Sequence, residues 1–294
     1  MISEQHVAPP ETSRKPRDDE IDVFGITNRG KSRPENQDHF VIGALAKRLH
    51  IRLSSLPELN EIPLSEDRVA FFAMVADGVG GGLKGEQASR MALEIATRYI
   101  TETARCYYQA EESEADLVKA LEEGARKCSR IIQERAAADR SAAGMATTLT
   151  VFIGVWPWIY LLQIGDSRYY QYRNGVLTQV SRDQTIAQQL ADRGIIPKEL
   201  VPNSPLTNVL SSSIGGHKTE PVVTRLENSW EYTHLLCTDG LTKHVSDERI
   251  AERLGQMQSA RQVCEDLVQD ALDGGGSDNI TVVVGQATPK DPPA

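Results

Sequence analysis

Residues 148–180 have the sequence TLTVFIGVWPWIYLLQIGDSRYYQYRNGVLTQV, and this stretch indicates the fold. It contains four apolar runs, at residues 148–155, 159–164, 168–173 and 176–180. The runs are rich in Val, Ile and aromatic residues, which favour β-strands. Asn174-Gly175, between the last two runs, is typical of a two-residue hairpin turn. Because strands joined by such short turns pair antiparallel, the stretch predicts an antiparallel sheet.

The order of the elements predicted elsewhere narrows the fold class. Further strands are predicted at residues 40–42, 69–76, 234–238 and 279–284, and helices at 86–104, 115–137, 184–191, 247–254 and 260–272. The first two helices follow one another without a strand between them, unlike the alternating pattern of a parallel sheet. We therefore expect an α+β protein in which antiparallel sheets are covered by helices in a layered sandwich.

One folded domain is expected over residues 20–286. Residues 1–19 and 287–294 are polar and aperiodic, which is typical of disordered tails. Residues 46–67 are mixed in character and are predicted to be an insertion between two strands.

The composition of the 294-residue chain excludes several functional classes. The 32 basic and 41 acidic residues give a net charge of −9, which argues against a nucleic-acid-binding face. The N-terminus has no apolar stretch of a signal peptide, and no apolar run is long enough to span a membrane. The four cysteines form no CxxC pair, so we expect free thiols in a cytoplasmic protein.

Aspartates stand at the ends of the predicted strands. They are Asp38, Asp77, Asp166, Asp239 and Asp278. If these strand ends converge, the carboxylates repel one another and lose hydration, unless cations bind between them. Carboxylates and carbonyls without His or Cys suit hard ions such as Mg²⁺ and Mn²⁺. An aspartate after a strand is also typical of an ordinary turn, so the pattern alone leaves both interpretations open.

The strings around the aspartates carry a resemblance to a known family. In chain order they are R-P-E-N-Q-D, D-G-V-G-G, G-D-S-R, T-D-G-L and S-D-N-I-T, and residues 144–149 add G-M-A-T-T-L. In that order they closely resemble the motifs of the type 2C family of metal-dependent protein phosphatases, in its bacterial form. The resemblance covers residues 22–284. It implies a four-layer α-β-β-α sandwich with two core Mn²⁺ or Mg²⁺ ions.

The resemblance also implies a role for each metal ligand. Asp77 would bridge the two core ions, and the carbonyl of Gly78 would be a further ligand. Asp239 and Asp278 would hold the first ion, and Asp38 would support the second.

Two further residues take roles by the same resemblance. Asp166, with Asp239, would contribute to a third and weaker metal site. Arg33 matches the arginine that clamps the substrate phosphate, a role suited to its planar guanidinium. A solvated surface arginine is the alternative for Arg33. The expected catalytic set is thus Arg33, Asp38, Asp77 and Asp239.

The chain departs from the family pattern in places. Val79 stands where many eukaryotic members have a histidine proposed as general acid, so metal-bound water is the expected acid. His39 is expected to be structural, because it points to the opposite strand face from Asp38. Residues 183–216 correspond to a flap beside the active site, and Asp183 is a candidate helix N-cap.

A glycine string offers a rival interpretation. Residues 80–85 match the G-x-G-x-x-G pattern of dinucleotide sites, but no strand follows the next helix as that fold requires. We expect these glycines instead to let the backbone turn sharply close to the metals.

The expected reaction is hydrolysis of phosphoserine or phosphothreonine in proteins by a metal-activated water. The partners would be phosphoproteins made by an opposing serine/threonine kinase, and a monomer is the default. Two alternatives stay open. One is a non-catalytic member of the fold that binds phosphoproteins, and the other is a phosphatase of small phosphate esters.

Overall fold

The structure is a computed structural model that describes residues 14–47, 67–80, 83–103 and 114–290. Most of the predicted N-terminal tail, residues 48–66 of the predicted insertion and residues 291–294 therefore lie outside the described residues. The ends of the predicted insertion belong to strands, where Lys47 pairs with Asp67.

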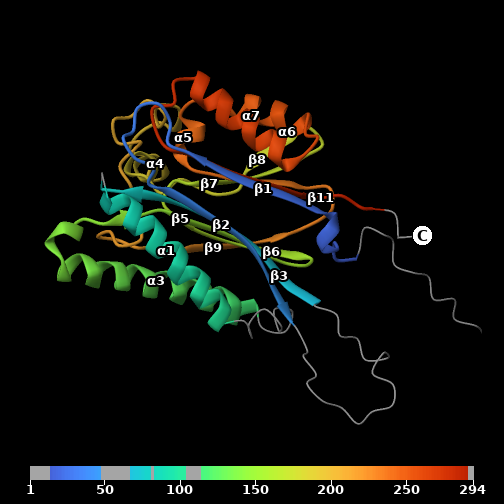
Figure 1. Cartoon of the computed structure of the whole chain (residues 1–294). Helices are drawn as coiled ribbons and strands as arrows, with labels where there is room; N and C mark the ends of the chain where they lie inside the picture. Colours follow the sequence, from blue (N-terminus) through green and yellow to red (C-terminus); the bar gives the residue numbers. More distant parts are fainter. Residues whose placement is uncertain (1–13, 48–66, 81–82, 104–113, 291–294) are drawn as a thin grey trace, which may run out of the picture.

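Two antiparallel sheets form the centre of the molecule (Figure 1). The first contains, in spatial order, β1 (Ile21–Asn28), β11 (Ile280–Ala287), β10 (Thr233–Cys237), β7 (Arg168–Arg173) and β8 (Val176–Gln179). The second contains β2 (Asp38–Lys47), β3 (Asp67–Val79), β5 (Leu149–Val155), β6 (Trp158–Ile164) and β9 (Val222–Glu227), with β4 (Ala146–Thr147) paired to β3. The stretch 148–180 therefore contributes hairpins to both sheets.

Helices cover the outer faces of both sheets. The second sheet is covered by α1 (Leu83–Glu102) and α3 (Glu114–Ala138), and the first by α6 (Asp247–Gly255) and α7 (Ala260–Asp273) (Figure 1). The short α4 (Ile186–Asp192) and α5 (Asp239–Thr242) lie at one end of the sandwich. The described residues also form 3-10 turns at Asp18–Glu20, Arg140–Ala142 and Lys198–Leu200. The predicted four-layer α-β-β-α sandwich is confirmed.

Three apolar layers hold the sandwich together. One lies between the second sheet and its helices and contains Met74 and Ile132, and another lies between the first sheet and α7 and contains Leu267 and Val282. The third fills the space between the sheets and contains Phe152. Burial of these side chains is the main favourable contribution to folding.

Most predicted elements are present, and the differences have local reasons. The strand β1 escaped prediction because Gly25 interrupts it; a Cβ there would lie 2.6 Å from the Phe40 ring. The strands β4 and β9 and the one-turn α5 were also missed. The predicted 174–175 turn is confirmed, since Asn174 and Gly175 have φ values of 50° and 83°.

Two further expectations concern thiols and membranes. Cys128, Cys237 and Cys264 are free and buried, whereas Cys106 lies outside the described residues. Among the described helices, none is both long and apolar enough to cross a bilayer.

Candidate active site

A cleft opens at the end of the sandwich where α4 and α5 lie. Its volume is about 970 Å³, and its lining includes Arg33, Asp77, Asp166, Asp239 and Asp278. Asp38 is 2% exposed and lies beside the cleft, directly opposite Asp77 in the pairing of β2 with β3. The structure therefore brings together all the aspartates predicted from the sequence, as well as the predicted arginine.

Two threonines fix the backbone of Asp77 at the end of β3. The Asp77 amide donates to Thr148 Oγ1 over 2.9 Å. The Asp77 carbonyl accepts from Thr147 Oγ1 at 2.8 Å and from the Thr148 amide at 2.9 Å. The Thr148 hydroxyl also bonds Ser167 Oγ at 2.8 Å, next to Asp166. The T-T pair of the sequence thus links two of the aspartate-bearing turns.

The end of β3 makes a close backbone contact that only glycine permits. A Cβ on Gly78 would lie 2.2 Å from the carbonyl oxygen of Gly85 in α1. Gly80 has a φ of +118°, which side-chain-bearing residues rarely adopt. Among the predicted glycines of residues 80–85, Gly80 therefore has a conformational reason and Gly85 takes part in the close contact, whereas residues 81–82 lie outside the described part.

Two other threonines hold the buried Asp38 carboxylate. Its Oδ2 accepts from Thr238 Oγ1 at 2.7 Å and from Thr281 Oγ1 at 2.8 Å. Thr238 directly precedes Asp239, and Thr281 lies three residues after Asp278. The T-D-G and S-D-N-I-T strings therefore supply hydroxyls as well as carboxylates. His39 points the other way, bonding Ser89 of α1 at 3.0 Å.

Asn279, directly before β11, holds the loop that carries Arg33 in place. Its side-chain amide donates to the carbonyls of Arg29 and Glu35 at 2.8 and 2.9 Å, and its Oδ1 accepts from the Gln37 amide at 2.9 Å. Within this loop Arg33 makes two contacts to Asp278, from Nη2 at 2.9 Å and from Nε at 2.7 Å. The Arg33 side chain is 50% exposed, so part of it faces the open cleft.

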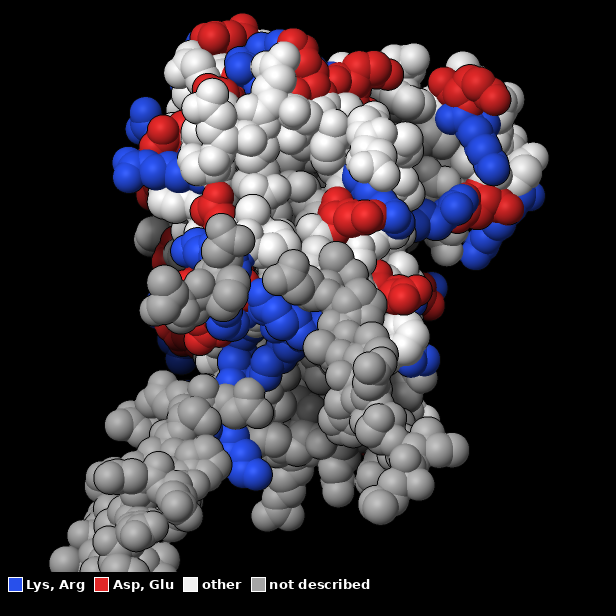
Figure 2. All heavy atoms as spheres, turned by 90° about the vertical axis from the view of Figure 1, so that its right-hand side faces the viewer, with Lys and Arg blue, Asp and Glu red and all other residues white. Residues whose placement is uncertain are grey.

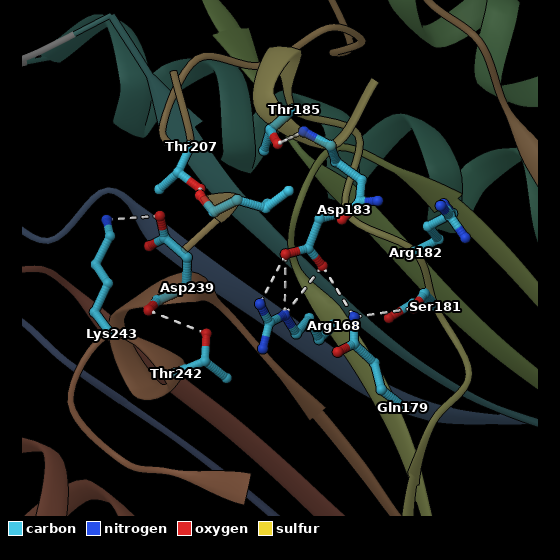
Figure 3. A network of polar contacts seen from close by, with 12 residues as sticks. Arg168, Gln179, Ser181, Arg182, Asp183, Thr185, Thr207, Asp239, Thr242 and Lys243 are labelled. Carbon is cyan, nitrogen blue, oxygen red and sulfur yellow. Dashed lines mark hydrogen bonds and ion pairs between the residues drawn. The ribbon is translucent and has the colours of Figure 1, made fainter. Parts of the chain in front are cut away.

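Lys243 is a site residue that sequence reasoning missed. Its Nζ lies 2.6 Å from Asp239 Oδ2 and 2.7 Å from Asp278 Oδ2. Figure 3 shows the Lys243 side chain directed at the Asp239 carboxylate. Its place four residues after Asp239 was the available signal, since side chains at that spacing meet on a helical turn.

Asp183, a candidate helix N-cap at the start of the predicted flap region, does not cap α4. Thr185 caps α4, accepting from the Gln188 amide. Asp183 instead accepts from Arg168 through Nε at 3.0 Å and Nη2 at 2.8 Å (Figure 3). A bidentate arginine partner outweighs a helix cap for this carboxylate.

Burial and mutual repulsion perturb the aspartates. Burial, then the charge of Asp38, raises the pKa of Asp77 well above its usual range. Burial likewise raises the pKa of Asp166 and of Asp239, with neighbouring carboxylates contributing. For Asp38, burial exceeds the effect of its threonine bonds and raises the pKa to about 7.

Asp278 behaves differently from the other four. Burial pushes its pKa upward, but the hydrogen bonds from Arg33 and Lys243 prevail and leave the pKa below its usual value. Two side-chain cations therefore outweigh burial for this carboxylate, whereas burial prevails for the other four, including Asp239 beside Lys243.

The residues present fit divalent metal ions. Within the described part of the chain, Asp38 Oδ1 and Asp239 Oδ1 are buried acceptors without a hydrogen-bond donor. Such oxygens are costly unless a cation binds them, and an all-oxygen donor set suits Mg²⁺ or Mn²⁺. As they stand, no three His, Cys, Asp or Glu side chains of the described residues form a complete ligand group. Two of the aspartates are instead bonded to Lys243.

The chain is similar to known phosphatases over most of its length. Residues 64–274 match the family model described as protein phosphatase 2C. The Mycobacterium tuberculosis serine/threonine protein phosphatase PstP is 35% identical over 217 residues, which are 74% of this chain and 40% of that protein. The Listeria monocytogenes serine/threonine phosphatase stp is 32% identical over 212 residues, covering 72% of this chain and 82% of that one.

Solved structures agree with the sequence comparison. The crystal structure of the Mycobacterium tuberculosis PstP/Ppp phosphatase aligns with a TM-score of 0.73 and 30% identity over 92% of this chain and 99% of that one. A structure of the PstP catalytic domain in complex with two manganese ions aligns with a TM-score of 0.70, 30% identity and the same coverage. The chain spans 40% of the length of the PstP sequences. From these matches and the arrangement of the site, the chain belongs to the protein phosphatase 2C family.

Proposed function

We propose that the chain hydrolyses phosphoserine and phosphothreonine in proteins at a Mn²⁺ or Mg²⁺ site. The observation that carries the proposal is the set of aspartates with raised pKa values at an open cleft beside Arg33. Natural proteins keep such destabilising clusters where they serve chemistry. The two manganese ions in the structure of the PstP catalytic domain support a binuclear centre.

Each aspartate would have a place in that centre. Asp77 and the Gly78 carbonyl would lie between two ions, Asp239 and Asp278 would hold the first, and Asp38 would support the second. When bound, the ions would lower the pKa of a water so that it attacks phosphorus as hydroxide. A third, weaker site would use Asp166 with Asp239.

The protein's own groups would position the substrate. Arg33 has a free side toward the cleft and could bind two phosphate oxygens through its guanidinium. Val79, 38% exposed and next to Gly78, offers no proton to the leaving serine or threonine. The leaving oxygen would therefore take its proton from water.

The nature of the cleft bears on the substrate. Besides the acidic floor it is lined by His217, Lys218 and the serines at 211–213, which could contact a peptide on either side of the phosphate. A phosphoprotein, made by an opposing serine/threonine kinase, fits this open cleft better than a small ester that would fill little of it. The three buried free thiols support the expectation of a cytoplasmic protein, and a monomer remains part of the proposal.

The test is phosphate release from a phosphothreonine peptide with Mn²⁺, with Mg²⁺ and with excess chelator. Metal-dependent turnover that stops in chelator supports the proposal. Comparable kcat/KM values for the peptide and for a small aryl phosphate would favour the small-ester alternative. A folded chain that binds the peptide without turnover under either metal would be a non-catalytic member.

A further inference from the structure

Lys243 contacts the two aspartates that the proposed function assigns to one metal ion. Its Nζ lies 2.6 Å from Asp239 and 2.7 Å from Asp278, both within ion-pair distance. The lysine follows the single turn of α5 that begins at Asp239, and its amide donates to the Asp239 carbonyl at 2.9 Å. The local backbone thus holds the lysine and the aspartate on one side of the turn.

The contacts occupy specific carboxylate oxygens. Lys243 forms ion pairs with Asp239 Oδ2 and Asp278 Oδ2, and Arg33 contacts both carboxylate oxygens of Asp278. Asp239 Oδ1, in contrast, is buried without a donor among the described residues. A positive charge therefore already lies where two of the proposed metal ligands meet.

A divalent ion bound between Asp239 and Asp278 would compete with the Lys243 ammonium for these oxygens and would be repelled by its charge. A lysine ammonium is a compact point charge on a flexible stem, so it can withdraw into the cleft when another cation binds. The Lys243 side chain is 27% exposed and lines the cleft, which leaves it a path to solvent. Its withdrawal costs the two ion pairs, and that cost reduces the affinity for the incoming metal.

We propose that Lys243 is an internal counter-cation that occupies Asp239 and Asp278 in the metal-free chain and lowers the affinity of this position for divalent ions. The inference rests on the proposed function, because it requires that these aspartates bind metal. In the metal-free chain Lys243 stabilises the carboxylates, and metal binding displaces it. The chain would therefore need a higher concentration of divalent ions to fill this site than a chain without the lysine.

The experiment compares Mn²⁺ binding by calorimetry for the metal-stripped wild-type chain and Lys243→Met, which removes the charge but keeps a long side chain. Thermal unfolding is measured on both, with and without Mn²⁺. The matched control is Lys218→Met, because Lys218 lines the same cleft but pairs with Glu220 at 2.7 Å. Lys243→Arg retains the charge.

We expect Lys243→Met to bind Mn²⁺ about tenfold more tightly, because a competing charge within ion-pair distance is gone. Its metal-free Tm should fall below that of the wild type, and saturating Mn²⁺ should remove the difference. Lys218→Met should match the wild type in both measurements, and Lys243→Arg should bind Mn²⁺ no more tightly than the wild type. If the methionine variant does not unfold cooperatively, Lys243→Gln provides the same comparison.

The outcomes separate this inference from the proposed function. If the wild type binds Mn²⁺ and hydrolyses phosphopeptide while Lys243→Met binds Mn²⁺ equally or more weakly, the inference alone is overturned. An equal gain in Mn²⁺ affinity for Lys218→Met would also overturn it, because the effect would then follow from any positive charge in the cleft. A wild-type chain that neither binds Mn²⁺ nor hydrolyses the peptide would overturn both proposals.

Discussion

Asp38 and Asp77 are direct partners across the antiparallel pair of β2 and β3. Like charges at opposed strand positions destabilise a sheet, and burial increases the cost. Threonine hydroxyls bind one oxygen of Asp38, but the raised pKa values of both aspartates show that compensation is incomplete. The two carboxylates therefore repel each other at this end of the strands, and bound cations would relieve the repulsion.

Asp77→Asn should separate stability from activity. We expect turnover to fall by at least about 100-fold, because the proposed bridging ligand is lost. The metal-free variant should be more stable by about 1 kcal/mol, because a repelling charge is removed from the site. Urea unfolding in chelator, together with phosphopeptide hydrolysis in Mn²⁺, measures both effects.

Asp183→Asn is the matched control for that change. Asp183 lies close to the site but pairs with Arg168 and lines no part of the cleft. Its substitution should reduce stability and leave Mn²⁺ binding unchanged. An Asp77→Asn variant with nearly normal turnover would exclude Asp77 from the metal centre.

The aspartates could be predicted because each stands beside a recognisable strand and within a distinctive string. The role of the neighbouring threonines could not be predicted from the sequence. Thr148 and Thr281 bond to aspartates that lie about 70 and 240 residues away in the chain. Lys243 was missed for a related reason. A lysine in a helical turn is ordinary on the surface, and only the approach of Asp278 from another strand makes it part of the site.

Arg33 should contribute to substrate binding more than to metal binding. Arg33→Ala is expected to raise KM for a phosphopeptide about tenfold, and Arg33→Lys should recover only part of the loss, because lysine lacks the bidentate guanidinium. Arg29→Ala, in the same loop, is the control, since the Arg29 side chain is exposed and donates to the Pro34 carbonyl at 3.4 Å. An unchanged KM in Arg33→Ala would remove this arginine from the phosphate site.

Glu20 should stabilise the end of the sandwich opposite the cleft, where basic side chains gather (Figure 2). Its buried carboxylate accepts from Arg14 Nη1 and from the Arg17 amide, each at 2.7 Å, and from the Lys290 amide at 3.1 Å. Glu20 thus ties the beginning of the described chain to its end. The hydrogen bond from Arg14, opposed by burial, is the main reason that the pKa of Glu20 is lowered.

We expect Glu20→Gln to lower the free energy of unfolding by about 2 kcal/mol, because charge-assisted bonds are lost in a buried position. Asp19→Asn is the control, since Asp19 is 61% exposed and its contact with Arg17 measures 3.4 Å. Urea unfolding at neutral pH measures both variants. Equal and small losses of unfolding free energy in the two variants would show that the buried bonds of Glu20 stabilise the fold no more than an exposed ion pair.

His234 should make stability depend on pH between about 6.5 and 4. It lies between the sheets, 5.2 Å from the Phe152 ring centre, and its Nδ1 bonds the Tyr169 hydroxyl at 2.8 Å. Burial lowers its pKa from 6.5 to about 4. As the pH falls through this range, the unfolded chain binds a proton that the folded chain does not, so the folded state loses stability by up to about 3 kcal/mol.

The test is urea unfolding of the wild type and of His234→Gln at several pH values from 7 to 4. Glutamine retains an acceptor for the Tyr169 hydroxyl but does not titrate, so the variant should lose less stability than the wild type over this range. His217→Gln is the control, because His217 is exposed at the cleft and should leave the wild-type pH dependence unchanged. Parallel pH profiles for the wild type and His234→Gln would contradict this prediction. They would mean that His234 accepts a proton as readily in the folded chain as in the unfolded one, because local opening relieves its burial between the sheets.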